Sequence, residues 1–339
     1  MQLVAGFVWK RQPQIRITKD FSQNLWVSLS AEEPQNTFAG CATGVNATAV
    51  AAATGGVANA VTCDLLGTGG LNGVTPTVGG VAGVSNTTPF SLNHVPDVIG
   101  KVAYEARFAD RDVHLEGFGM YRDFYDRAEF VNPLTTFAQA GNHDTTGYGF
   151  GGGVIVPVLP RRLDFQASGL TGKGIGSYGS AQFSDATFAA NGAASPIQET
   201  MLLGGLTLHA TPAIDLYAFG GEEVVQPNYF TTSAAGAPFT GFGYGVPTAN
   251  NSGCFNTVTV GTCGGSAKRV WELTGGMWDK IYKGSFGEIR VGVQYSYIQR
   301  ELFQGSGGGP IPSATAPLNF APKQNENTVM ASLRYYPFQ

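Results

Sequence analysis

The feature that most constrains the fold of this chain is a recurring alternation of apolar and polar residues with a period of two. In the segment 286–303, Ile289 and Val291 occupy one parity, while Glu288 and Arg290 occupy the other. Successive side chains of a β-strand point to opposite faces, so this segment, as a strand, has one apolar face and one charged face. Spacings typical of an amphipathic helix occur almost nowhere, and the chain is therefore predicted to be all-β.

Eleven segments show this alternation, and the links between them are alternately short and long. The predicted strands cover residues 13–21, 25–34, 97–107, 113–126, 145–159, 162–175, 197–210, 213–226, 268–282, 286–303 and 325–338. The long links cover residues 35–96, 127–144, 176–196, 227–267 and 304–324. Tight turns at one rim and long loops at the other are typical of an antiparallel transmembrane β-barrel, whose long links are extracellular.

The lengths of the predicted strands support the same fold. A tilted strand needs about 9 to 11 residues to cross the hydrocarbon layer, whereas strands of soluble sandwiches average about five or six. An open sheet edge in lipid would leave main-chain polar groups without partners, so such strands must close into a barrel. No apolar stretch approaches the roughly 20 residues of a membrane-spanning helix. The alternative is a large secreted β-sandwich or β-solenoid with the same alternation.

The odd number of strands bears on how much of the barrel this sequence contains. Bacterial single-chain barrels have an even number of strands and keep both termini in the periplasm. Eleven strands place the two ends of the chain on opposite sides, and no signal peptide is recognisable at the N-terminus. We therefore expect residues 1–339 to form a single transmembrane β-barrel domain whose N-terminal strands are missing or are supplied by a neighbouring chain.

The charged parity of the strands is predicted to face the inside of the barrel and to line water. Charged groups at membrane depth are tolerated where they line an aqueous cavity, and opposed rows of arginine and carboxylate groups sort solutes by charge. The predicted pore-lining residues are Arg16, Lys101, Glu105, Arg107, Glu116, Arg122, Arg162, Asp164, Glu272, Glu288, Arg290, Arg300 and Arg334. For any one of them, the alternative is that it only pairs with an opposite charge inside the barrel.

The four cysteines lie in two of the predicted outer loops. We expect one disulfide within each loop, Cys41 with Cys63 and Cys254 with Cys263, because extracellular compartments are oxidising. A metal site is the alternative for these cysteines. Their spacings and the lack of a neighbouring histidine do not fit zinc ligation.

The sequence contains no recognisable catalytic motif. A net charge of −4 gives no basic excess for a nucleic-acid partner, and G-x-S-x-G, H-E-x-x-H, Walker and C-x-x-C patterns are absent. His94, His114, His143 and His209 are scattered, and the second and fourth fall on the charged parity, where they are predicted to line water. We expect no enzyme, no cofactor and no metal. A barrel hydrolase is the alternative, because a Ser-His-Asp triad need not be close in sequence.

Two segments resemble strand motifs of the DcaP-like outer-membrane porins. The run that begins with R-Q-P-Q-I-R at Arg11 continues into a strand that ends with Ala31, Glu33 and Pro34. The segment PDVIGKVAYEA, which begins at Pro96, is similar to the family's P-D-[VIL] strand start. The resemblance implies a trimeric, 16-stranded channel for small anionic solutes, of which this chain would be about the C-terminal two thirds.

The chain departs from the family pattern in two places. Such barrels commonly end on phenylalanine, whereas Phe338 is followed here by Gln339. The cysteine-bearing loops are also not part of the pattern, so the resemblance says nothing about what those loops do.

These observations together predict a porin of the outer membrane of a Gram-negative bacterium. Small hydrophilic, anionic solutes would diffuse through a charged, water-filled lumen in which Arg16, Arg290, Arg300 and Arg334 favour anions. Its expected partners are outer-membrane lipid, lipopolysaccharide, the solutes and, by the resemblance, further copies of the chain in a homotrimer. The alternative is a non-conducting barrel that acts as a structural anchor, a surface-loop display or a casing for a partner protein.

Overall fold

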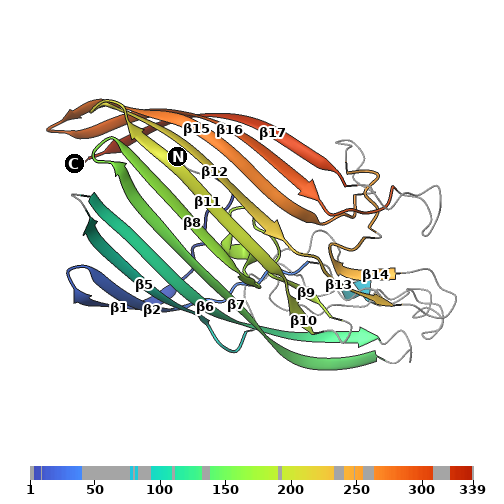
Figure 1. The fold of residues 1–339 in the computed structure, drawn as a ribbon. Coiled ribbons are helices and arrows are strands. Elements are labelled where there is room, and N and C mark those ends of the chain that lie inside the picture. Colours follow the sequence, from blue (N-terminus) through green and yellow to red (C-terminus); the bar gives the residue numbers. More distant parts are fainter. Residues whose placement is uncertain are drawn as a thin grey trace.

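The computed structural model shows a curved antiparallel sheet with short chain segments on its concave side (Figure 1). It describes residues 4–8, 10–39, 77–78, 81–82, 93–108, 111–131, 138–189, 193–232, 240–247, 249–254, 263–307 and 321–337. Within these ranges, no helix combines the length and the apolar character needed to cross a membrane.

The sheet has eleven strands, each antiparallel to its neighbours. Across the sheet they are β1 (Gln14–Ser22), β2 (Leu25–Glu32), β5 (Asp97–Phe108), β6 (Arg111–Val131), β7 (Ala138–Leu159), β8 (Leu163–Lys173), β11 (Gln198–His209), β12 (Ile214–Val225), β15 (Ala267–Gly284), β16 (Gly287–Leu302) and β17 (Lys323–Tyr336). Strands that follow one another along the chain also lie side by side in this sheet. The predicted all-β antiparallel fold and its eleven strands are confirmed.

The long links contain short elements of their own. They are η1 (Gly176–Tyr178) and three two-stranded pairs, β3 (Thr77–Val78) with β4 (Val81–Ala82), β9 (Ala186–Phe188) with β10 (Ala194–Pro196), and β13 (Asn228–Thr232) with β14 (Thr240–Tyr244). The link between β8 and β11 is the important one for function, because η1 and β9 lie on the concave side of the sheet.

β6 and β7 extend further than the alternation predicted. The predicted loop over 127–144 is shortened to 132–137, because Arg127 pairs with Asn142 and Val131 with Ala138. Main-chain hydrogen bonds can continue past the point where the side-chain alternation ends, since a ladder outside lipid needs no apolar face. The alternation therefore marks only the part of this hairpin that has an apolar outer face, rather than its full length.

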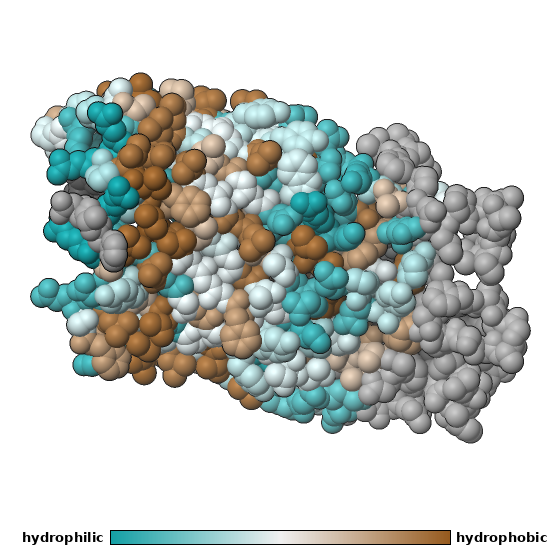
Figure 2. Space-filling view, viewed as in Figure 1, coloured by the Kyte–Doolittle hydropathy of each residue, from teal (hydrophilic) through white to brown (hydrophobic). Residues whose placement is uncertain are grey.

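The two parities of the strands face different surroundings. On β16, Val293 and Tyr295 are 48% and 49% exposed, whereas their neighbours Gln294 and Ser296 are buried at 2% and 1%. In Figure 2, apolar side chains gather over the outer surface of the strands and form a band near the end with the short turns. The predicted division into an apolar outer face and a polar inner face is present in the sheet.

The edges of the sheet are formed by β1 and β17. In the described part of the chain, β1 pairs in the sheet with β2 alone and β17 with β16 alone. Closure of the sheet into a barrel therefore stays a prediction.

The core of the molecule lies on the concave side of the sheet. Met120, Leu170 and Met201 point inward from β6, β8 and β11 and pack with Ile175 and Tyr178 of the link that follows β8. All five residues are at most 5% exposed. The space on the concave side of β6, β8 and β11 is therefore filled by the link that follows β8.

Candidate functional site

The candidate functional site is the concave face of the sheet, which carries the charged parity of the strands. Near the short-turn end, β5 and β6 bring four charged or titratable groups together. The Nδ1 atom of His114 lies 3.2 Å from Glu105 Oε1, and its Nε2 atom lies 3.4 Å from Glu116 Oε2. Lys101 forms an ion pair with the same Glu116 carboxylate. Three predicted pore-lining residues thus meet around a histidine.

A second cluster of this kind lies on β8, β11, β12 and β15. His209 has Nδ1 2.7 Å from Asp215 Oδ1 and Nε2 3.1 Å from Asp164 Oδ2. Lys280 Nζ lies 2.9 Å from the other Asp215 oxygen. An imidazole can donate to two carboxylates at once only when it is protonated, so this arrangement favours a local positive charge.

The groups in these two clusters are hydrated. The side chains of Lys101, Asp164 and His209 are 38%, 37% and 35% exposed. Charged groups with this exposure remain accessible to dissolved ions, and their pairwise attraction is screened by water and salt.

Arginines at the C-terminal strands lie against aromatic rings. The guanidinium of Arg290 forms an ion pair with Glu288 and lies 4.9 Å from the centre of the Tyr336 ring. The guanidinium of Arg334 lies 4.7 Å from the centre of the Trp278 ring. A ring face holds such a cation in place without neutralising it, so the positive charge of Arg334 remains available to a solute, whereas that of Arg290 is paired with Glu288.

The remaining predicted pore-lining residues divide into exposed and buried positions. Arg107 lies 3.8 Å from Asp112 at the short-turn end. Arg16, Arg162 and Arg300 are exposed, and none of the ion pairs between described residues includes them. Glu272 is 7% exposed and binds the N-terminal segment, as described below.

Arg122 is an exception to the prediction that the charged parity lines water. Its side chain is 0% exposed, so the expectation that it faces an aqueous lumen is wrong. The guanidinium donates to carboxylates of Asp97 (3.0 Å) and Asp185 (2.8 Å). Its other acceptors are the Gln35 carbonyl (2.9 Å), the Asn36 side-chain oxygen (3.0 Å) and the Gly174 carbonyl. A guanidinium can be buried here because its charge and its donors are matched by these groups.

The acceptors of Arg122 belong to two links that fold onto the inner face of the sheet. Asp185, which binds Arg122, also accepts from the main-chain N–H groups of Ser177 and Thr37, both at 2.9 Å. The Ala39 N–H donates to the Ala186 carbonyl at 2.8 Å, which joins the first link to β9. One arginine on β6 therefore holds the links after β2 and after β8 against the wall.

Tyr178 of η1 lies within this assembly. Its hydroxyl donates to Asp97 at 2.9 Å, and its ring centre is 5.1 Å from the Arg122 guanidinium carbon. Burial raises the pKa of Tyr178 above its ordinary value. The hydroxyl therefore stays protonated and acts as a donor.

The N-terminal segment 4–10 is a third element on the inner face (Figure 1). The main-chain N–H of Gly6 donates to Glu223 at 2.9 Å, and that of Ala5 donates to Glu272 at 3.1 Å. Val4 is 2% exposed and packs with inward-facing aromatic residues of β12. The carboxylates of two strands therefore position this segment through its backbone rather than through its side chains.

The close approach of the N-terminal segment depends on glycine at two positions. A Cβ atom at Gly221 of β12 would lie 1.9 Å from the Ala5 carbonyl oxygen. Gly6 has a φ of +86°, and a Cβ atom there would lie 2.1 Å from the carbonyl oxygen of Leu202. Larger residues would push the segment away from the wall.

Lys10 connects the N-terminal segment to the Arg122 assembly. Its ammonium group donates to the Gln35 carbonyl at 2.7 Å and to the Ser177 hydroxyl at 2.8 Å. It also lies 4.6 Å from the centre of the Tyr178 ring. Burial, and then the positive charge of Arg122, lower the pKa of Lys10 to about 8.

Free space remains between the N-terminal segment and the opposite wall. A cavity of about 220 Å³ has Val4 and Phe7 on one side. His114, Glu116 and Gln166 of the wall line its other side. The strands also contribute apolar residues such as Val154 and Leu203, so the lining is mixed, and the cavity reaches the first histidine cluster.

Glu199 is a buried carboxyl group that the sequence analysis did not single out. It points inward from β11, is 1% exposed, and neither of its oxygens has a hydrogen-bond partner among the described residues. A carboxylate in such surroundings is costly, so the neutral acid is favoured there.

Of the two predicted disulfides, one lies among the described residues. Cys254 and Cys263 are joined in the link between β14 and β15. Cys41 and Cys63 lie outside the described residues, so their pairing stays a prediction.

The features described so far resemble those of outer-membrane channels. Antiparallel strands with an apolar outer face and a polar inner face, joined by short turns at one end and long loops at the other, are typical of such channels. The described parts of the links after β2 and β8 also fold inward and narrow the space within the sheet. Comparisons with known proteins agree with this class.

The chain is similar in structure to the outer membrane channel DcaP of Acinetobacter baumannii. The TM-score is 0.56 at 13% sequence identity, and the match covers 98% of this chain. The chain spans 64% of the length of that channel. The expected likeness to DcaP-like porins is thus confirmed at the level of the fold.

A second structural match is to the porin NanC, with a TM-score of 0.33 and 10% identity over 95% of this chain and 91% of that one. No protein-family model matches the chain, and no curated protein does.

The residues that hold the inward segments were mostly missed by sequence reasoning. Asp97, Asp185 and Glu223 bind Arg122 or the N-terminal segment, yet none was singled out as a site residue. Glu223 could have been found, because it lies on the inward parity of its strand. The partnership between Asp185 and Arg122 links residues 63 positions apart and has no counterpart in any local pattern.

Proposed function

We propose that this protein is a diffusion channel of a bacterial outer membrane that admits small hydrophilic, anionic solutes. The observation that supports this most directly is the row of partly exposed charged groups on the polar inner face of a porin-type sheet. Such groups line water at membrane depth, and a barrel of porin size encloses an aqueous channel. The protein would act by passive diffusion, with no chemical step.

The inward-folded links form the constriction of the proposed channel. Arg122 holds the links that follow β2 and β8, and Glu223 and Glu272 hold the segment 4–10. Solutes would pass the cavity of about 220 Å³ beside Phe7 and then meet the hydrated histidine clusters. The cross-section at the segment would set the size limit.

A preference for anions is supported by the arginines that lack an acidic partner. Arg16, Arg300 and Arg334 have no ion pair among the described residues, whereas Lys101 and Lys280 are neutralised by carboxylates. We propose that the pore-lining set comprises Arg16, Lys101, Glu105, Arg107, Glu116, Arg162, Asp164, Glu288, Arg290, Arg300 and Arg334. Unpaired positive charges along an aqueous path raise the local concentration of anions.

Assembly as a homotrimer and contact with lipopolysaccharide are part of the same proposal. The trimer rests on the family resemblance of the sequence motifs, and the contact with lipopolysaccharide rests on the proposed outer-membrane location. Crosslinking in intact outer membranes should trap a species of three chains, and a species of one chain only would oppose the trimer.

The test of the proposed function is conductance in planar lipid bilayers. Purified, folded protein should give stepwise current increases, and in a tenfold KCl gradient the reversal potential should have the sign of an anion-selective pore. Heat-denatured protein at the same concentration serves as the control. Folded protein without current steps would contradict the proposal, and a cation-selective potential would contradict the solute class.

One observation favours a second candidate, a non-conducting barrel that serves as an anchor or a casing. The outer half of the interior is filled by buried residues such as Ile175 and Tyr178, at 0% and 3% exposed. If the fill is complete, the folded protein will pass no current even after the segment 4–10 is displaced. Conductance that appears on displacement would instead identify the segment as a constriction.

A further inference from the structure

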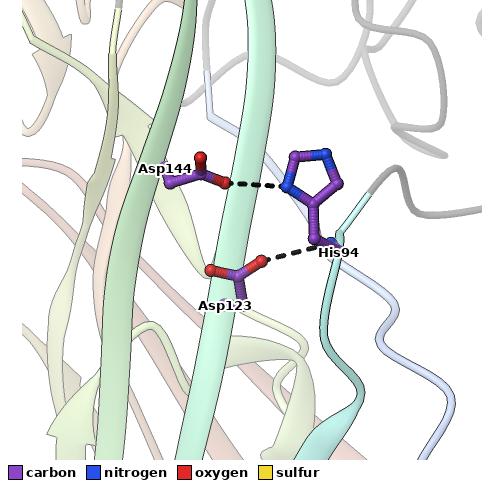
Figure 3. A group of neighbouring side chains, drawn as sticks. All are labelled: His94, Asp123 and Asp144. Carbon is purple, nitrogen blue, oxygen red and sulfur yellow. Dashed lines mark hydrogen bonds and ion pairs between the residues drawn. The ribbon is translucent and has the colours of Figure 1, made fainter.

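A cluster of three potential metal ligands lies outside the interior. His94 precedes β5, Asp123 lies on β6 and Asp144 on β7, and each offers one ligand atom within 4.8 Å of the other two (Figure 3). His94 Nδ1 is 3.2 Å from Asp144 Oδ1, and the His94 main-chain N–H donates to Asp123 Oδ2 at 3.2 Å. Three separate elements thus bring one imidazole and two carboxyl groups to one place.

The cluster lies on the outer face of the sheet, beyond the aromatic residues of its wall. Tyr121 and Tyr148 are cross-strand partners on β6 and β7 and are 43% and 41% exposed. Asp123 and Asp144 follow them, toward the loop end, on the same parity. Exposed aromatic residues on this face are typical of the membrane interface, so the cluster lies on the aqueous side of it.

Asp123 is the most constrained of the three ligands, because its carboxylate is buried without a counter-charge. The residue is 6% exposed, and among the described residues its one hydrogen bond comes from the His94 main-chain N–H. No lysine or arginine of the described chain lies within ion-pair distance of it. Buried carboxylates in proteins are paired with a cation or coordinate a metal. In Figure 3, the carboxylate points toward His94.

The second ligand, His94, is held in position by its surroundings. The His94 ring centre lies 4.0 Å from that of Tyr125. The preceding residue is fixed as well, because the Asn93 side-chain oxygen accepts from the Tyr125 main-chain N–H at 3.0 Å and from the Asn36 side-chain amide at 2.8 Å. Ligands whose orientation is fixed by neighbouring groups lose less freedom when a metal binds.

We propose that His94, Asp123 and Asp144 bind a divalent transition-metal cation, for which Zn²⁺ is the representative. An imidazole nitrogen with carboxylate oxygens suits zinc and its neighbours, whereas Ca²⁺ and Mg²⁺ take oxygen ligands alone. Ligand distances of about 2.0 to 2.2 Å at tetrahedral angles place two ligand atoms about 3.3 to 3.6 Å apart. The three ligand atoms lie within 4.8 Å of one another. The exposed side chains of His94 and Asp144 therefore move inward by up to about 1 Å, and water completes the coordination.

The experiment is a calorimetric titration of the folded, detergent-solubilised full chain with ZnCl₂. The protein should bind one Zn²⁺ per chain through this cluster, and excess Mg²⁺ should leave this binding unchanged. His94→Ala should abolish the site, and Asp144→Asn should weaken it at least tenfold. Both side chains are more than half exposed, at 58% and 59%, so neither change should disturb folding, which heat-dependent gel mobility would verify.

His143→Ala is the matched control, because it removes the adjacent histidine from the opposite parity of β7 and should leave the affinity unchanged. Zinc binding that is unaffected by His94→Ala and Asp144→Asn would overturn the proposal, and so would no binding up to millimolar Zn²⁺. Binding of Ca²⁺ in preference to Zn²⁺ would overturn the metal class. None of these outcomes depends on whether the protein conducts ions.

Discussion

The outer half and the short-turn half of the concave face use charged groups in different ways. In the outer half, Arg122, Asp97 and Asp185 are fully buried and bind one another and the main chain of two links. In the short-turn half, Lys101 and His209 are about one-third exposed and lie beside the carboxylates of neighbouring strands. The same alternation of residues therefore produces a structural anchor in one half and a hydrated, charged surface in the other.

Burial, rather than residue type, therefore decides whether an inward-facing charge has a structural role or forms part of a hydrated surface. Breaking a buried ion pair leaves an uncompensated charge and costs about 3 to 5 kcal/mol, whereas pairs near water contribute about 0 to 1 kcal/mol. Substitutions in the outer half should consequently change the structure, and substitutions in the other half should change selectivity.

The largest effect is expected from Arg122→Met. The variant leaves Asp97 and Asp185 buried without their cation and releases two links, so the free energy of unfolding should fall by about 3 to 5 kcal/mol. Urea titration followed by gel mobility measures this. Arg162→Met, which removes an exposed arginine, should change it by less than about 0.5 kcal/mol. Equal losses in the two variants would remove the distinction between the halves.

The next effect is expected from Gly221→Val, which tests the N-terminal segment. The new side chain occupies the space of the Ala5 carbonyl and pushes the segment 4–10 off β12. Single-channel conductance should rise severalfold because the passage beside Phe7 widens. Gly204→Val, whose added Cβ would meet nothing closer than 3.9 Å, is the matched control. Unchanged conductance in the folded Gly221→Val variant would show that the segment does not limit the current.

A smaller effect, on selectivity alone, is expected from charge reversal in exposed positions. Arg300→Glu and Arg16→Glu should move the reversal potential toward that of a cation-selective pore, with unfolding free energies within about 0.5 kcal/mol of the unmodified protein. Lys19→Glu makes the same charge change on the apolar parity of β1 and should leave the potential unchanged. A shift of equal size in all three variants would indicate a general surface-charge effect.

The smallest effect is expected from the titration of Lys10. Folding lowers its pKa from 10.5 to about 8, so the folded state binds this proton less tightly than the unfolded chain. Stability should therefore rise between about pH 8 and pH 10.5, and the positive charge at the constriction should be lost as the pH rises through about 8. The charged groups around it are Glu32, Asp97, Arg122 and Asp185.

The measurement for Lys10 is the anion preference between pH 7 and pH 9. The preference should fall across this range in the unmodified protein and stay level in Lys10→Met. Lys283→Met, which removes an exposed lysine, should keep the pH dependence. A Lys10→Met variant with the full pH dependence would assign the titration to another group.

The fold could be predicted from the sequence to a large extent because its determinants are local. Alternation on β16 follows from the division of the sheet into an apolar outer face and a polar inner face, and each segment carries this information by itself. The short links between strands could also be predicted, because each joins two strand segments that are neighbours in the sequence. The extent of β6 and β7 was underestimated because main-chain pairing can continue past the end of the side-chain alternation.

The interior of the site could be predicted only in part. The sequence indicates that Arg122 faces inward, but its burial depends on Asp185 and Gly174, which arrive from a link far along the chain. The attachment of Gly6 to Glu223 is a main-chain contact across 217 residues and involves no side chain of the segment. Contacts of this kind have no period and no motif, so they emerge only from the three-dimensional structure.

The central claim is that the two parities of each strand face different solvents, and spin labels along β16 test it most directly. In a variant whose native cysteines are replaced by serine, single labels at residues 289 to 296 would be studied in liposomes by collision with oxygen and with a water-soluble nickel complex. Odd positions should favour oxygen, which dissolves in lipid, and even positions should favour nickel, with the preference reversing at every residue. A uniform preference along the strand, or labels at 290 and 294 that favour oxygen, would contradict the account.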